Sequence, residues 1–159
     1  MSESILDFEA EADDNLSKMF LTFKIGEETY GISIKSVIEI IGIQQIAEVP
    51  SSEYFMKGVI NLRGQVIPVM DIRLRFGLSP REYDGRTCII VVISQDAMIG
   101  LIVDRVSDVL DIDPTQIQSA QEEGSSSDHI YIDGLGKVGN DVQILLDIEK
   151  LVPKRHKVE

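Results

Sequence analysis

The amino-acid sequence contains an internal repeat, and this repeat constrains the fold more than any other feature. Shifting the chain by 69 residues lays residues 29–43 (TYGISIKSVIEIIGI) over residues 98–112 (MIGLIVDRVSDVLDI). The two segments match at Gly31 and Gly100, and apolar residues fall on apolar residues along their length. Strand-rich segments can also match by chance, so a second match is needed.

A second pair of segments matches at a slightly larger offset. Shifting by 76 residues lays residues 58–76 over residues 134–152, with an aspartate at positions 71 and 147. The additional seven residues fit into the polar stretch 118–128, where an insertion costs little closure entropy. The sequence therefore predicts two halves built to one plan.

Each half contains short runs rich in β-branched residues between turn signals, which predict strands. The predicted strands span residues 19–25, 29–33, 38–43, 59–62, 65–70, 87–94, 97–103, 107–112, 129–132 and 141–146. Helical signals are brief and fall in residues 34–41, 53–57 and 72–76.

We therefore predict an all-β fold with a few short helices, in which two pseudo-equivalent five-stranded barrels pack together. The first barrel takes residues 18–82 and the second residues 83–152. A groove between two such barrels is a natural place to hold a partner.

The two ends of the chain differ from the rest in charge. Residues 2–15 hold six acidic residues and no basic one, so we expect residues 1–17 to form a flexible, solvated arm. A short docking turn at Ile5, Leu6 and Phe8 is the alternative. Residues 153–159 are expected to form a basic, solvated tail.

The overall charge narrows the classes of partner. A formal net charge of −12 disfavours nucleic acid and anionic membrane surfaces, because both attract clustered lysine and arginine. No apolar run approaches the ~20 residues that span a bilayer, so direct membrane insertion is not expected. The one cysteine, Cys88, lies in an apolar run and is expected to pack as a small hydrophobic residue in a reducing cytosol.

Catalytic, cofactor and metal motifs are not apparent. The glycines of GLGKVG (residues 134–139) match a dinucleotide fingerprint, but a strand and not a helix follows, so we interpret the segment as a turn. The aspartates at 104, 108, 111 and 113 lack the spacing of a calcium loop and are interpreted as solvated strand and turn acids. We therefore expect neither an enzyme nor a bound cofactor or metal.

Two charged residues stand in apolar surroundings. Glu39 is the one acid in VIEIIGI, and Arg63 occupies the tip of NLRG between two strand-forming segments. A carboxylate among isoleucines is costly unless it is paired or faces water. Both residues could face water separately. Alternatively, Glu39 and Arg63 pair and order a polar rim for a partner, beside an apolar patch of Val37, Ile38 and Ile40.

The segment GVINLRGQVIPVMDIRLRFG (residues 58–77), preceded by TYGISIKSVIEI and followed by GLIVDRVSDVL, resembles the CheW chemotaxis coupling proteins. The resemblance runs from about Phe20 to Val152. It implies SH3-like barrels and a cytoplasmic scaffold, monomeric in isolation, that joins membrane receptor arrays through its partners. Those partners would be the cytoplasmic tip of methyl-accepting chemoreceptors and the regulatory domain of the kinase CheA. A scaffold of another chemosensory kinase pathway, in motility or development, is the alternative.

The resemblance also implies which residues meet each partner. The receptor-facing and rim positions would be Val37, Glu39, Asn61, Arg63 and Gly64. The kinase-facing loop would include Gln118 and Glu122. In this loop the chain departs from the family pattern, because Gln118 stands where an arginine can occur and Glu123 where an aromatic residue can occur.

Overall fold

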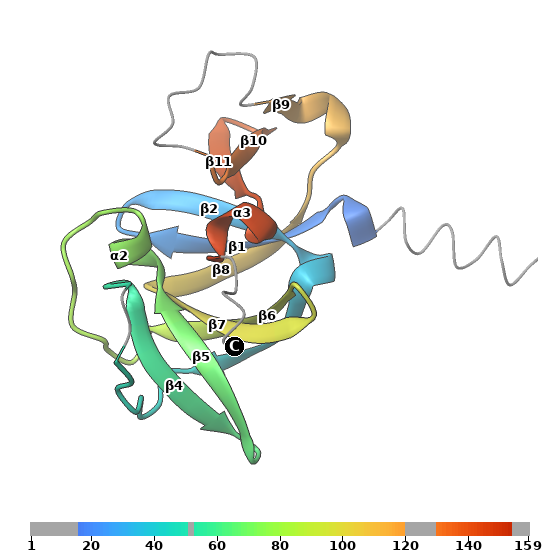
Figure 1. Ribbon diagram of the computed structural model, residues 1–159. Helices are drawn as coiled ribbons and strands as arrows, with labels where there is room; N and C mark the ends of the chain where they lie inside the picture. The colour runs from blue at the N-terminus through green and yellow to red at the C-terminus, as the bar shows by residue number, and fades with distance from the viewer. Residues whose placement is uncertain (1–15, 51–52, 120–129, 154–159) are drawn as a thin grey trace, which may run out of the picture.

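The computed structural model describes residues 16–50, 53–119 and 130–153, and within these ranges the chain forms two β-sheets (Figure 1). The five-stranded sheet has the order β3 (Val37–Gly42), β6 (Cys88–Ser94), β7 (Ala97–Val103), β5 (Gln65–Asp71), β4 (Met56–Leu62). The six-stranded sheet has the order β8 (Arg105–Asp111), β1 (Met19–Ile25), β2 (Glu28–Ser33), β11 (Asp141–Leu146), β10 (Ile132–Val138), β9 (Ile117–Ser119). The short helices are η1 (Ile34–Ser36), α2 (Ile72–Arg75), η2 (Pro114–Gln116) and α3 (Ile148–Leu151). None of the described helices is long and apolar enough to cross a membrane.

The two sheets confirm the predicted mainly β fold of two pseudo-equivalent, SH3-like barrels. The repeat offsets relate the strands directly: a shift of 69 residues takes β1 onto β6 and β3 onto β8, and a shift of 76 takes β4 onto β10 and α2 onto α3. The six-stranded sheet has one strand more than the predicted five, because β9 pairs with β10.

The barrels are not contiguous halves of the chain, however. The hairpin β1–β2 from the first half lies in the sheet of β8, β10 and β11, while the hairpin β6–β7 from the second half lies in the sheet of β3, β4 and β5. Strand β5 pairs in parallel with β7, and β11 pairs in parallel with β2. The predicted barrels of residues 18–82 and 83–152 therefore need correction: each half donates its first hairpin to the barrel of the other.

Each barrel is closed where the chain beyond one edge strand crosses to the other edge. Ala47, after β3, forms two backbone hydrogen bonds with Val59 of β4, both with N to O distances of 2.9 Å. The crossing is tight, since a Cβ on Gly58 would lie 2.1 Å from the carbonyl oxygen of Ala47. Gly134, the repeat equivalent of Gly58, meets the backbone of Gln118 in the same way. Only glycine fits such an approach.

The two α-helices start at equivalent aspartates. Asp71 Oδ1 accepts a hydrogen bond from Leu74 N at 3.4 Å, and Asp147 Oδ1 accepts one from Glu149 N at 2.9 Å. Gly77 (φ 78°) ends α2, with Leu78 N donating to Arg73 O in a Schellman arrangement. The predicted helix at 72–76 is thus confirmed.

Other local expectations were wrong. Residues 53–55 form a bend and a turn that lead directly into β4, and no helix follows them. The segment 134–139 was interpreted as a turn, but residues 134–138 belong to β10. Gly134 and Gly136 let the neighbouring chain pack closely against this strand and do not interrupt it. Of the predicted strand at residues 129–132, residues 130 and 131 form a turn and only Ile132 belongs to a strand, at the start of β10.

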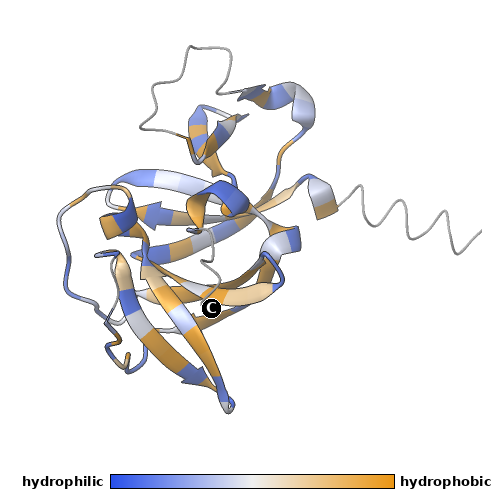
Figure 2. Cartoon of the chain, viewed as in Figure 1, coloured by the Kyte–Doolittle hydropathy of each residue, from blue (hydrophilic) through white to orange (hydrophobic). Residues whose placement is uncertain are grey.

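One hydrophobic core joins the two sheets and a second fills the barrel of the five-stranded sheet. The shared core takes Phe23 and Ile32 from one sheet and Ile90 and Leu101 from the other, all fully buried. Figure 2 shows hydrophobic residues running along the strands of both sheets and hydrophilic residues gathered at the turns. The junction between the barrels is therefore packed and apolar.

The interiors of the two barrels differ at equivalent positions. In the five-stranded sheet, six positions are apolar and at most 2% exposed: Ile60, Ile67, Val69, Ile89, Val91 and Ile102. The repeat offsets place different residues in the six-stranded sheet, namely Gly136, Gln143, Leu145, Phe20, Thr22 and Ser33. Gln143 is 6% exposed, and its Oε1 has no hydrogen-bond partner among the described residues. At these positions the barrel of the six-stranded sheet therefore has the less apolar interior.

We expect Gln143→Leu to raise the free energy of unfolding by about 1 kcal/mol, because it removes a buried oxygen without a partner. The reciprocal change, Ile67→Gln in the other barrel, should lower it by more than about 2 kcal/mol. Urea denaturation measures both. A less stable Gln143→Leu variant would show that the amide stabilises the barrel.

Candidate protein-interaction site

The turn between β4 and β5 consists of Arg63 and Gly64. Both residues have positive φ angles, 52° and 87°, as in a type I′ turn, whose twist matches that of the flanking strands. An arginine seldom adopts a positive φ angle, because this left-handed backbone conformation favours glycine. Asn61 Oδ1 accepts a hydrogen bond from Gly64 N at 2.7 Å. These contacts fix the point at which the Arg63 side chain leaves the hairpin.

The structure brings Arg63 to Glu39, as the sequence led us to expect. Arg63 donates through Nη2 to Glu39 Oε1 and through Nη1 to Oε2, the latter over 3.3 Å. Glu39 lies on β3, at one edge of the five-stranded sheet, whereas the hairpin of Arg63 includes the strand at the other edge. The bidentate pair therefore spans the curled sheet from edge to edge.

This ion pair is open to solvent. The side chain of Arg63 is 71% exposed and that of Glu39 is 27% exposed. The hydrogen bond and the charge of Glu39 raise the pKa of Arg63, so the guanidinium stays charged. Water and salt screen such a pair, so it adds little to folding stability. Its main effect is to hold two charged groups in a fixed arrangement at the surface.

Apolar side chains lie exposed on the strands around the pair. Ile38 and Ile40 are 49% and 44% exposed; they alternate with Glu39 along β3 and so lie on the other face of this edge strand. Val66, which faces Asn61 in the β4–β5 register, is 66% exposed. Val37 is half-buried and packs against the shared core. An ordered charged rim beside exposed aliphatic residues has the composition of a protein-binding surface. Sequence reasoning missed Val66, although its place after the turn was a signal.

The remaining predicted site residues lie elsewhere. Gln118 is on β9, at the edge of the six-stranded sheet, and is not brought together with Arg63. It lines a hollow of about 250 Å³ with Thr115, Leu135 and Val142. Glu122 lies outside the described residues. The candidate site residues thus fall on two different sheets.

A partly buried ion pair was also missed. Asp104 and Arg73 have side chains that are 11% and 18% exposed, and Arg73 Nε donates to Asp104 Oδ1 over 3.0 Å. The interpretation of Asp104 as a solvated acid is therefore wrong, because the chain folds α2 against it. No local pattern indicated this contact, since 31 residues separate the two partners.

A second buried carboxylate is also paired. Tyr83 donates its hydroxyl to Asp71 Oδ2 at 2.7 Å, and burial raises the pKa of this tyrosine. This bond attaches the loop between α2 and β6 to the start of α2.

Fold and site together define a two-barrel protein-interaction module. The model of the CheW-like domain matches residues 19–156. The chemotaxis protein CheW of Klebsiella aerogenes is 40% identical over 141 residues, covering 89% of this chain and 85% of the relative. The chemotaxis protein CheW of Thermotoga maritima is 34% identical over 135 residues, covering 83% and 85%.

A solved structure agrees with these relatives. The crystal structure of the scaffolding protein TtCheW from Thermoanaerobacter tengcongensis superposes with a TM-score of 0.78 at 32% identity, covering 85% of this chain and 92% of that one. The chain belongs to the CheW-like domain family. As a member it is a chemotaxis coupling adaptor.

The hydrogen bond beneath the turn gives a direct test of its rigidity. Asn61→Ala should lower the free energy of unfolding by about 1 kcal/mol and speed hydrogen exchange at the Gly64 amide, because that amide loses its acceptor. Asn61→Asp retains an acceptor oxygen and is the matched control. Unchanged exchange in Asn61→Ala would mean that the turn does not need this bond.

Proposed function

We propose that this chain is a non-enzymatic adaptor that couples the cytoplasmic tip of methyl-accepting chemoreceptors to the regulatory domain of the histidine kinase CheA. The observation that carries the proposal is the exposed, bidentate Glu39–Arg63 pair beside exposed aliphatic residues of β3. The relatives named above are chemotaxis proteins, which favours this role over a scaffold of a motility or developmental pathway.

The receptor contact is assigned to the rim around Arg63. Glu39 and Arg63 satisfy each other's charges in the free protein, and their exposed atoms can accept further hydrogen bonds or donate them to polar groups of the receptor. The adjacent Ile38 and Ile40 supply apolar area that is removed from water on binding. Val37, Asn61 and Gly64 shape the strand and turn that carry these groups.

The kinase contact is assigned to the segment around Gln118 and Glu122. Gln118 lies on β9 of the six-stranded sheet, whereas Arg63 belongs to the five-stranded sheet, so both partners can be bound at the same time. Once one partner is held, the other acts at a high effective concentration. A cytoplasmic protein, monomeric in isolation, would in this way join receptor arrays without inserting into the membrane.

Charge reversal at the rim tests the receptor contact. Arg63→Glu should weaken binding of a receptor-tip fragment by about tenfold or more, because it places a second carboxylate beside Glu39. Isothermal titration calorimetry measures the affinity, and a thermal melt checks that the fold is retained. The melting temperature should change little, since the pair is exposed.

The matched control is Arg86→Glu, which makes the same charge change in the loop before β6. It should bind the receptor fragment as the unmodified protein does. An equal loss of affinity for the receptor fragment in both variants would indicate a general effect of the charge change. Unchanged affinity in Arg63→Glu, with an unchanged melt, would exclude the rim from the receptor contact.

A variant of the other sheet should separate the two contacts. Gln118→Asp is expected to weaken binding of the CheA regulatory domain several-fold while leaving receptor binding unaltered, since it adds negative charge only near β9. Titrations of the two partners, separately and then together, measure this. If neither partner binds the unmodified protein, the coupling function is wrong.

A further inference from the structure

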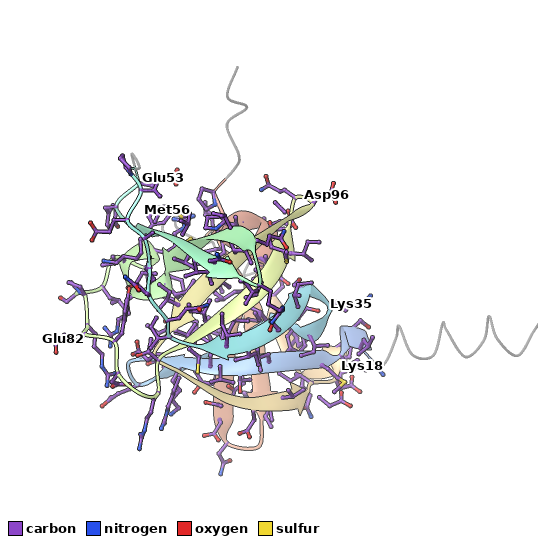
Figure 3. The ribbon with its side chains drawn as sticks, turned by 90° about the horizontal axis from the view of Figure 1, so that it is seen from below. Lys18, Lys35, Glu53, Met56, Glu82 and Asp96 are labelled. Carbon is purple, nitrogen blue, oxygen red and sulfur yellow. The ribbon has the colours of Figure 1, made fainter. Side chains whose placement is uncertain are left out.

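A charged cavity of about 480 Å³ lies apart from both surfaces discussed above. It is formed by the β1–β2 turn, the loop between α2 and β6, and the start of β8. Figure 3 shows Glu82, in the same loop, on the opposite side of the molecule from Lys35, which lies in the short helix η1 just before the strand of Glu39. Four basic residues line the cavity, namely Lys24, Arg81, Arg86 and Arg105. Such a concentration of positive charge is unexpected on a chain of net charge −12.

Two of these basic residues are neighbours on adjacent strands. Lys24 of β1 and Arg105 of β8 are cross-strand partners in the antiparallel register. Like charges in this position destabilise a sheet. Within residues 16–50, 53–119 and 130–153, neither forms an ion pair with a carboxylate, and neither does Arg86. Three cations therefore face one cavity without a bound counter-charge.

The most buried carboxylate of the cavity already accepts hydrogen bonds from three other residues. Asp104 accepts hydrogen bonds from Gly26 N at 2.7 Å, Arg73 Nε at 3.0 Å and Arg81 Nη1 at 3.3 Å. It thereby ties together the β1–β2 turn, α2 and the loop before β6. Within the described residues, none of the ion pairs of Asp104 involves Lys24 or Arg105.

Of the other two carboxylates, Asp84 pairs with Arg81, with 3.7 Å between Nη2 and Oδ2, and neither pairs with Lys24, Arg86 or Arg105 among the described residues. Asp84 Oδ1 accepts a hydrogen bond from Arg86 N at 2.8 Å, and this bond lowers the pKa of Asp84 and ties the carboxylate to its own turn. Glu27, at the tip of the β1–β2 turn, forms no ion pair with a described residue. The simplest alternative to a ligand is that Glu27 screens Lys24 through water.

We propose that this cavity binds the phosphate groups of a small molecule, with Lys24, Arg86 and Arg105 as the binding residues. Arginine offers a planar, bidentate fork to a phosphate, and lysine adds a compact charge. A bound diphosphate would remove the repulsion between the cross-strand cations. The volume greatly exceeds the ~30 Å³ share of one water molecule, so two hydrated phosphate groups can enter.

The first experiment titrates the full chain with pyrophosphate, and with inorganic phosphate, at constant ionic strength. Calorimetry should show one site that prefers pyrophosphate. The double variant Lys24→Gln/Arg105→Gln should lose affinity for it by tenfold or more. The control Lys137→Gln/Lys150→Gln makes the same charge change away from the cavity and should keep the affinity. Equal losses in the two double variants would overturn the proposal.

The stability of the free protein gives a second readout that a purely structural role would not produce. Without pyrophosphate, Lys24→Gln should melt at a higher temperature than the unmodified protein, because the cross-strand repulsion is gone. With pyrophosphate, the order should reverse, since only the unmodified site gains stability from the ligand. A lower melting temperature of Lys24→Gln in both conditions would contradict the proposal.

A substitution at Glu27 should change the affinity for pyrophosphate in the opposite direction. Glu27→Gln should bind pyrophosphate several-fold more tightly, since the competing carboxylate is removed, while Glu149→Gln on α3 should not. Binding of a hexaglutamate peptide without any response to pyrophosphate would overturn the proposal in favour of an acidic polypeptide partner. Absence of any pyrophosphate binding at millimolar concentration would also overturn it.

Discussion

The parallel strand pairs β5–β7 and β11–β2 are the contacts on which the rest of the structure depends. Each pair joins strands from different halves of the chain, and each brings a glycine against a bulky aliphatic residue. A Cβ on Gly100 would lie 2.8 Å from Val69 Cγ1, and one on Gly31 would lie 3.0 Å from Leu145 Cδ2. The two glycines occupy the same place in the repeat. They allow the strands to approach, so the hairpins can be exchanged and one core can be shared.

The exchange of hairpins between the two halves of the chain explains where the charged surfaces lie. It fills the centre of the five-stranded sheet with β6 and β7, which leaves β3 and β4 as its edges. Edge strands are natural places for partners to bind, although the edge of β4 is paired with Ala47 at Val59. The Glu39–Arg63 pair spans these two edges. The phosphate cavity lies where the exchanged β1–β2 hairpin meets β8, and Asp104, between β7 and β8, holds it together.

The sequence predicted most of the strands and the repeat, and it offered the Glu39–Arg63 pair as one of two arrangements, because each has a local signature. Alternating apolar residues mark the strands, and an isolated charge among isoleucines must either find a partner or face water. The exchange of hairpins could not be predicted, because the repeat is equally compatible with separate or exchanged halves. The Arg73–Asp104 pair depends on that tertiary arrangement and was missed for the same reason. Gly134 and Gly136 were interpreted as turn residues because glycine in a strand gives the same local pattern.

The direct continuation of one sheet into the other has a mechanical consequence. Strand β2, inside the six-stranded sheet, leads through the three residues of η1 into β3, the edge strand that carries Glu39. Likewise β7, inside the five-stranded sheet, is separated from β8 by Asp104 alone. Neither barrel can be displaced against the other without stretching these short backbone connections. A force that acts on Glu39 is therefore transmitted through the backbone into the opposite barrel. The two barrels are expected to move as one rigid body.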